Sequence, residues 1–264
     1  MGVLANCRVA VFDMDGVLWT MDEPLPQAAE AVARCRRSGA AVFFLTNNSS
    51  RSRQSYVEKL ARFGIPSTQD DIVTSAHATA IRLAADRPGA TVVMIGEAGL
   101  RQELSDAGLR VVEYAEGDSV DFVVVGWDRM LSYDKLAQAH GAVVRGGARF
   151  IATNRDATYP DAGGRTLPGG GSIVAAVATC TGVEPETIGK PEPYTLNCIL
   201  DTVGALPGEC LVIGDRLDTD IALGRRVGAI TALVLTGVST REECEAAPAD
   251  ARPDHIWPDL SHLE

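Results

Sequence analysis

The sequence predicts a doubly wound α/β fold, in which helices cover both faces of a parallel β-sheet. Short apolar runs alternate with amphipathic stretches along the whole chain of 264 residues, as expected when strands alternate with helices. Most of these runs are apolar on both faces, as buried parallel strands are, whereas a half-exposed antiparallel strand would alternate apolar and polar residues. Glycine closes several amphipathic stretches, which is typical of helix C-termini.

The expected elements follow from these patterns in chain order. The apolar runs predict strands over residues 8–12, 40–45, 91–95, 110–112, 121–125, 149–152, 210–213 and 230–235. The amphipathic stretches predict helices over residues 27–38, 53–63, 134–145, 173–180, 194–203 and 220–227. The glycine run Gly169-Gly170-Gly171 lacks the spacing of a dinucleotide-binding loop, and we interpret it as a loop that opens a helix.

The charge balance narrows the range of partners. A formal net charge of -11 and an isoelectric point near 4.9 disfavour broad contact with nucleic acid or with an anionic membrane. A small polar substrate fits better. If that substrate carries phosphate, an acidic chain must gather positive charge locally, from a metal, a lysine and backbone N–H groups.

The cysteines and the apolar runs bear on localisation. Six cysteines lie far apart without a C-x-x-C pair, and we interpret them as small buried apolar residues of a protein in a reducing cytoplasm. No run approaches the roughly 20 apolar residues of a membrane span, and the first residues lack the features of a signal peptide. We therefore expect a soluble, cytoplasmic protein.

Two carboxylates follow the first expected strand. Asp13 and Asp15 are two residues apart, so a strand-like backbone would project both to the same side, and Gly16 allows a sharp turn behind them. Two carboxylates at close range repel each other unless a cation or a shared proton lies between them. The structural alternative is an ordinary helix cap or surface loop.

Polar groups also follow two later elements. Thr46-Asn47-Asn48-Ser49 comes after the second strand, where it offers hydroxyl and amide groups but could equally cap the next helix. Lys190, in Gly189-Lys190-Pro191, precedes a helix and suits a phosphate as a point charge. Taken alone, it would be a surface lysine.

A second acidic cluster follows the strand over residues 210–213. Asp215, Asp218 and Asp220 offer the oxygen ligands that Mg²⁺ prefers, although Asp218 or Asp220 could instead cap the following helix. Ligands of open α/β sheets bind at the carboxyl ends of the strands, where these clusters lie.

These motifs, in this order, resemble those of the haloacid dehalogenase superfamily of aspartate-nucleophile phosphotransferases, and within it those of subclass IIA. The resemblance rests on segments spread over nearly the whole chain: Asp13-Met14-Asp15-Gly16-Val17-Leu18-Trp19, Thr46-Asn47-Asn48-Ser49-Ser50-Arg51-Ser52, Ala152-Thr153-Asn154-Arg155-Asp156, Gly214-Asp215-Arg216-Leu217-Asp218-Thr219-Asp220-Ile221 and Thr236-Gly237-Val238-Ser239-Thr240.

The resemblance implies a role for each motif residue. Asp13 would be the nucleophile that forms an aspartyl-phosphate, and Asp15 would protonate the leaving alcohol and later activate water. The resemblance also implies phosphate binding by Thr46, the backbone of Asn47, and Lys190. Mg²⁺ would be held by the Asp13 carboxylate, the Asp15 carbonyl and Asp215, while Asp220 would hold a ligand water or Lys190. The role of Asp218 is less defined.

The resemblance also implies an inserted cap. Only about thirty positions separate the first two motifs, so the cap would be the α/β block over residues 77–186, flanked by core residues 1–76 and 187–264. In this cap, residues 154–160 resemble the family's specificity loop, so we expect Asp156 and Tyr159 to face the substrate; the alternative is a well-capped turn. Because caps of this subclass often mediate dimers, we also expect a homodimer formed through the cap.

The favoured function is a Mg²⁺-dependent phosphatase acting on a small phosphorylated metabolite. Dehalogenases of the superfamily lack the second aspartate that Asp15 provides, which argues against dehalogenation. Two alternatives stay open: a noncatalytic protein that binds a phosphometabolite, and a phosphotransferase that uses an acceptor other than water.

Overall fold

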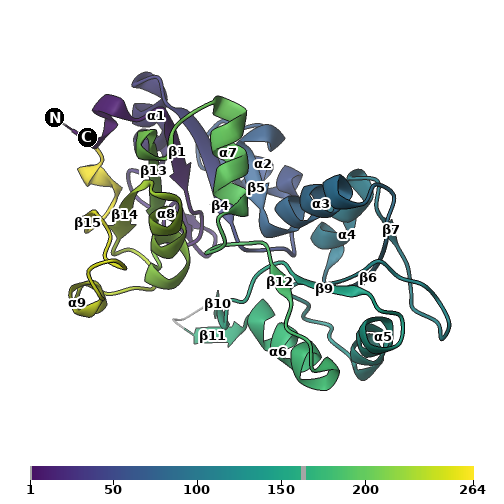
Figure 1. Ribbon diagram of the computed structural model, residues 1–264. Helices are drawn as coiled ribbons and strands as arrows, with labels where there is room; N and C mark the ends of the chain where they lie inside the picture. Colours follow the sequence, from purple (N-terminus) through teal and green to yellow (C-terminus); the bar gives the residue numbers. More distant parts are fainter. Residues whose placement is uncertain (1, 162–164) are drawn as a thin grey trace. The chain divides into compact units, whose positions relative to one another are not determined.

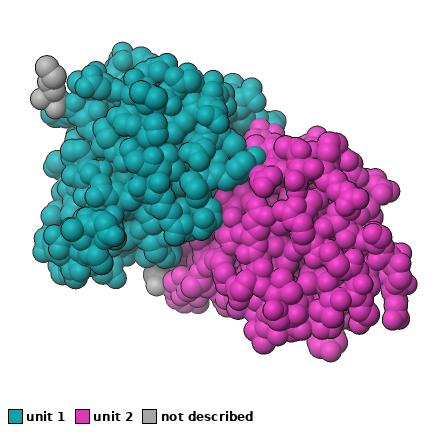
Figure 2. Space-filling view, viewed as in Figure 1, with its two compact units in different colours: residues 1–46, 56–73, 190–264 teal, residues 47–55, 74–189 magenta. Residues whose placement is uncertain are grey.

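The computed structural model describes residues 2–161 and 165–264 (Figure 1). These residues form two compact units, coloured separately in Figure 2. The first unit contains Met1–Thr46, Tyr56–Val73 and Lys190–Glu264, and the second contains Asn47–Ser55 and Thr74–Gly189. The second unit is thus largely one insertion into the first, Thr74–Gly189. It also includes the short segment Asn47–Ser55.

The first unit is built on a six-stranded sheet in the order β15-β14-β13-β1-β4-β5. The strands are β1 (Val9–Phe12), β4 (Ala41–Thr46), β5 (Ile72–Thr74), β13 (Cys210–Gly214), β14 (Ile230–Val234) and β15 (His255–Trp257). β1 pairs in parallel with both β4 and β13, and β14 continues the parallel order to β15. The central β1 therefore ends between the ends of β4 and β13.

Helices cover both faces of this sheet, because successive strand residues point to opposite sides. Ala10 and Phe12 belong to one core with α1 (Ala28–Arg37) and α2 (Arg53–Arg62). Val9 and Val11 belong to another core with α7 (Tyr194–Val203) and α8 (Ala222–Val227). In Figure 1, α7 and α8 lie side by side. Burial on both faces explains why these strands read as continuous apolar runs.

The second unit has its own parallel sheet, in the order β12-β9-β8-β6-β7. Its strands are β6 (Thr91–Ile95), β7 (Arg110–Val111), β8 (Phe122–Val125), β9 (Arg149–Ala152) and β12 (Glu186–Thr187). Its helices are α3 (Ser75–Asp86), α4 (Ala98–Asp106), α5 (Tyr133–Val144) and α6 (Gly170–Thr181), and two hairpin strands, β10 (Thr158–Asp161) and β11 (Arg165–Pro168), precede α6. Side chains of β8 and β9 pack with α5 and α6 in one core.

The expected α/β fold, with a parallel core sheet and an inserted second parallel sheet, is confirmed. The predicted strands and helices lie where expected within a few residues. Several other elements were not predicted. They are the helices α3, α4 and α9 (Arg241–Ala246), the single strands β5, β12 and β15, and two antiparallel pairs, β2 (Trp19–Thr20) with β3 (Glu23–Pro24) and β10 with β11. All of these strands have only two to four residues, too few for a clear period.

Two expected helices begin earlier than predicted. α6 begins at Gly170 rather than at residue 173, and a Cβ at Gly171 would overlap the Arg155 carbonyl, so glycine is needed there for close packing. The helix expected over residues 220–227 starts earlier as a π-helical turn, Leu217–Ile221, that leads into α8.

The cysteines only partly match the expectation. All six are free, and Cys180 is exposed and Cys198 half-buried, while the other four are buried. Among the residues that the structure describes, no helix has the length and apolar character needed to span a membrane.

Candidate active site at the carboxyl ends of β1 and β13

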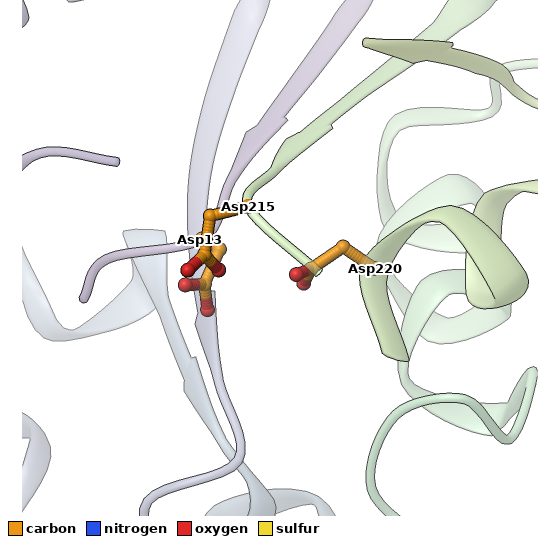
Figure 3. Close-up of side chains that lie close together, drawn as sticks. All are labelled: Asp13, Asp215 and Asp220. Carbon is orange, nitrogen blue, oxygen red and sulfur yellow. The ribbon is translucent and has the colours of Figure 1, made fainter. Parts of the chain in front are cut away.

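Three aspartates of the first unit converge on one point (Figure 3). Asp13 directly follows β1 and Asp215 directly follows β13, and the Asp13 N–H donates to the Ile213 carbonyl over 2.8 Å. Asp220 comes from the π-helical turn behind Asp215. Each carboxylate offers an oxygen, and these three oxygens lie within 4.8 Å of one another. All three residues are buried.

Lys190 supplies the positive charge at this point. Its Nζ lies 2.5 Å from Oδ1 of Asp13 and 2.6 Å from Oδ1 of Asp220, and it also donates to the Leu45 carbonyl at 3.4 Å. The side chain is 4% exposed. Sequence alone would have allowed a surface lysine, whereas the structure places Lys190 inside the acidic cluster, where a buried charge finds partners.

Burial and mutual repulsion control the protonation of this cluster. Burial raises the pKa of Asp13 well above its ordinary value, and the charges of Asp220 and Asp215 add to this effect, while Lys190 opposes it. Burial likewise raises the pKa of Asp215 to about 7, with Asp220 contributing. Burial alone would lower the pKa of Lys190, but its two carboxylate partners raise it, so Lys190 stays charged. Three carboxylates against one ammonium leave an excess of negative charge that a divalent cation would neutralise.

The loop that contains Val238 and Ser239 holds Asp215 in place. The N–H of Val238 donates to Oδ2 of Asp215 over 2.8 Å, and the Ser239 N–H donates to the Asp215 carbonyl over 3.0 Å. Gly237 and Gly16 lie so close to this carboxylate that a Cβ on either would overlap Oδ2. Gly16 also has a φ of 80°, which favours glycine.

Asp220 and Asp218, which the spacing could not separate, have different surroundings. Asp220 lies against Gly214, where a Cβ would overlap the aspartate, and its Oδ2 accepts from the Arg216 N–H at 3.2 Å. Asp218 is largely exposed and pairs with the Arg216 guanidinium at 2.8 Å. Asp220 therefore belongs to the cluster and Asp218 does not.

The remaining core residues of the expected site lie at the same strand ends. Thr46 is the last residue of β4 and is buried. Asp15 is half-buried, and its Oδ1 accepts a hydrogen bond from Nε1 of Trp19 at 2.8 Å. Trp19 was not singled out from sequence, since nothing in its spacing indicates that its indole points toward Asp15.

The other expected site residues lie in the second unit and are linked to one another. Nδ2 of Asn47 donates to Oδ1 of Asp156 at 2.9 Å, and Nδ2 of Asn48 donates to Oη of Tyr159 at 3.4 Å. The Asn47 carbonyl accepts from Oγ of Ser75 at 2.6 Å and from Nδ2 of Asn154 at 2.7 Å. The segment after β4 is thus fastened to the loop that contains Asp156.

The donor set fits a hard divalent cation. Mg²⁺ prefers oxygen ligands, usually one or two carboxylates with water and substrate oxygens completing the shell. Asp13 and Asp215 provide carboxylates at adjacent strand ends, and neither histidine nor cysteine belongs to the acidic group found among the described residues. Oxygen ligands alone argue against a zinc site of the thiolate or imidazole type.

The chain is similar to known proteins over almost its whole length. Residues 10–110 match the family model described as haloacid dehalogenase-like hydrolase, and residues 187–263 match the model described as HAD-hydrolase-like. Human chronophin is 39% identical over 96% of this chain and 90% of its own length. The acid sugar phosphatase of Staphylococcus epidermidis is 39% identical over 98% of this chain and 97% of its own length.

Solved structures show the same fold. The glycerol phosphate phosphatase of Mycobacterium tuberculosis, solved in complex with magnesium, superposes with a TM-score of 0.90 and 35% identity, covering 100% of this chain and 78% of that chain.

Proposed function

The chain belongs to the haloacid dehalogenase-like hydrolases, as a subclass IIA phosphatase, and from this premise we propose that it hydrolyses the phosphomonoester of a small metabolite through an aspartyl-phosphate on Asp13. The chain is thus a phosphoric monoester hydrolase. The observation that carries the specific proposal is the contact of Asp13 with Lys190, inside a cluster completed by Asp215 and Asp220.

The nucleophile is suited to its role by position. Asp13 stands at the end of the central strand with its backbone held by β13, so its carboxylate has a fixed direction. In the first step, a carboxylate oxygen of Asp13 forms a bond to phosphorus as the bond to the alcohol oxygen breaks, and Asp15 gives its proton to that oxygen. In the second step, Asp15 takes a proton from water, which attacks phosphorus and releases Asp13.

Positive charge and N–H groups hold the phosphoryl oxygens. Lys190 lies beside the nucleophile, and we propose that it binds the transferred group together with the Thr46 hydroxyl and the Asn47 N–H. A charge that is already in place costs no reorganisation as the transition state forms, which is why such groups contribute strongly to phosphoryl transfer.

We propose Mg²⁺ as the cofactor, held by the carboxylates of Asp13 and Asp215 and by the Asp15 carbonyl. The ion would neutralise the carboxylates and the phosphate together, so that the two can approach each other. The bond from Lys190 to Asp220 supports the second of the two roles expected for Asp220, that of holding the lysine.

We further propose that the second unit supplies substrate contacts through Asp156 and Tyr159. Their hydrogen bonds to Asn47 and Asn48 support this proposal, because they tie both side chains to the segment that follows Thr46. The names of chronophin, acid sugar phosphatase and glycerol phosphate phosphatase do not point to one shared substrate, so we propose a class of substrate, a small phosphorylated metabolite. A homodimer formed through the second unit, and a cytoplasmic location that suits six free cysteines, complete the proposal.

The direct test is turnover of 4-nitrophenyl phosphate with Mg²⁺ by the protein and by Asp13→Ala. We expect turnover by the protein and none by the variant. Absence of turnover on a panel of phosphorylated metabolites would favour the noncatalytic alternative. Product analysis in the presence of alcohols would detect transfer to an acceptor other than water.

A further inference from the structure

One buried indole points its N–H at a residue of the proposed mechanism. Trp19 is fully buried, and its Nε1 donates to Oδ1 of Asp15 over 2.8 Å. A buried indole N–H needs an acceptor, but a backbone carbonyl commonly serves, as Pro168 does for Trp127 in the second unit. At Trp19 the acceptor is instead the carboxylate of Asp15, which is the proton donor in the proposed function.

Side chains from one side of α2, and Phe63 directly after it, pack against the indole ring. Tyr56 stacks on it at an interplanar angle of 14°, and Phe63 packs against it with ring centroids 5.8 Å apart. Between them, Nζ of Lys59 lies 4.4 Å from the ring centroid. Residues 56, 59 and 63 are three and four positions apart, so they follow one another along the same side of a helix.

Lys59 is a buried charge that the proposed mechanism does not use. Its Nζ donates to the Met21 carbonyl over 2.6 Å and lies 3.3 Å from Oδ1 of Asp22. Met21 has a φ of 58° in the turn between β2 and β3. Lys59 therefore holds the turn that follows Trp19 and at the same time contacts the indole ring.

The backbone of Trp19 is also tied to the loop that contains Asp15. The Gly16 N–H donates to the Trp19 carbonyl over 2.7 Å, and the Trp19 N–H donates to the Met14 carbonyl over 3.3 Å. Donor and acceptor of the indole–carboxylate bond thus belong to one closed loop. The backbone of this loop keeps the two residues close together, while the contacts of Tyr56, Lys59 and Phe63 hold the ring.

We propose that Trp19 is a positioning residue that sets the orientation of the Asp15 carboxylate for proton transfer. By holding Oδ1, the indole fixes the rotation of the carboxylate about its Cβ–Cγ bond, and with it the direction of Oδ2. As the bond from phosphorus to the alcohol breaks, its electron pair takes the proton from Oδ2, while Asp13 completes its bond to phosphorus. This inference rests on the proposed function, since it requires Asp15 to be the proton donor.

The inference predicts an effect that depends on the leaving group. A 4-nitrophenolate leaves without a proton, whereas an alkoxide needs one as the bond breaks. Loss of the indole N–H should therefore slow alkyl phosphates more than 4-nitrophenyl phosphate. A loss of packing alone would slow both equally.

The test replaces the N–H with minimal change in volume. We would introduce 3-benzothienylalanine, which has sulfur in place of the indole N–H, at position 19, alongside Trp19→Phe. kcat/KM is measured with Mg²⁺ for 4-nitrophenyl, phenyl and alkyl phosphates, because it covers the steps up to departure of the alcohol. We expect a loss of about 10-fold for alkyl phosphates and under about twofold for 4-nitrophenyl phosphate. Trp257→Phe, in the same core, is the control and should change neither.

A second readout does not depend on turnover. The indole ¹⁵N–¹H signal that Trp19→Phe removes should exchange slowly with solvent and should shift when Asp15 is replaced by alanine. A uniform loss across the leaving-group series, or an indole signal that does not respond to Asp15→Ala, would overturn the inference.

Asp15→Asn separates this inference from the proposed function. If Asp15→Asn retains the leaving-group dependence of the unmodified protein, the assignment of Asp15 as proton donor fails. If Asp15→Asn steepens the dependence and the position-19 variants do not, only the role of Trp19 fails.

Discussion

Lys190 lies 2.5 Å from the carboxylate of Asp13, although the two residues are 177 positions apart in the chain. The same ammonium contacts Asp220 at 2.6 Å, so it joins the end of β1 to the turn that follows β13. A buried cation beside the proposed nucleophile is the feature that most separates a phosphoryl-transfer site from a helix cap, because capping requires no buried lysine.

Replacing this cation should abolish most of the activity. We expect Lys190→Met to lower kcat with 4-nitrophenyl phosphate by at least about 100-fold, since a fixed charge on the transferred group is lost. Lys135→Met is the matched control, because Lys135 also pairs with a buried aspartate, Asp128, at 2.6 Å, but in the second unit. Comparable losses in both variants would argue that general destabilisation, and not the site, is responsible.

Removing divalent cations should abolish turnover and destabilise the fold. Three buried carboxylates share one ammonium, so Mg²⁺ relieves repulsion and binds the native state in preference to the unfolded chain. We expect EDTA to stop hydrolysis and lower Tm, with both restored by added Mg²⁺. In Asp215→Asn, Mg²⁺ should raise Tm less than in the unmodified protein. Undiminished turnover in chelator would contradict the proposed mechanism.

The stability of the metal-free protein should fall as pH rises toward neutrality. The pKa of Asp215 is raised to about 7 in the fold, so between its ordinary value of 3.8 and about 7 the native state holds a proton that the unfolded chain has lost. This group therefore stabilises the fold less as pH rises through that window. Tm measured in EDTA from pH 5 to pH 8 should decrease more in the unmodified protein than in Asp215→Asn. Equal pH dependence in both proteins would contradict the shift.

A single methyl group at Gly237 should disable the metal site. A Cβ there would overlap Oδ2 of Asp215, so we expect Gly237→Ala to displace this carboxylate and weaken activation by Mg²⁺ by about tenfold or more. Gly208→Ala is the control, since a Cβ at Gly208 meets nothing within 4 Å. Activity at increasing Mg²⁺ checks the prediction, and an unchanged activation curve in Gly237→Ala would refute it.

Local pattern predicted the fold class and the two strand-end aspartates, whereas the roles of Lys190 and Asp220 beside them were implied by the family resemblance. An apolar run that ends in Asp13, or in Asp215, already places a carboxylate at a strand end. The contacts that orient these residues could not be predicted from the sequence. Val238 meets Asp215 and Trp19 meets Asp15 through turns whose geometry no period reveals. The π-helical turn over Leu217–Ile221 likewise decided between Asp218 and Asp220, which the expected α-helix could not.

The division of the first unit into three chain segments has a consequence for biosynthesis. The central strand β1 leaves the ribosome well before its neighbour β13, which begins only at Cys210. Until then the growing chain has β4 as its partner on one side and an open, aggregation-prone edge on the other. The second unit, completed at Gly189, has all its strands by that point. During synthesis, the second unit can therefore finish folding before the first. The proposed active site can form only afterwards, once Asp215 and Asp220 have been synthesised.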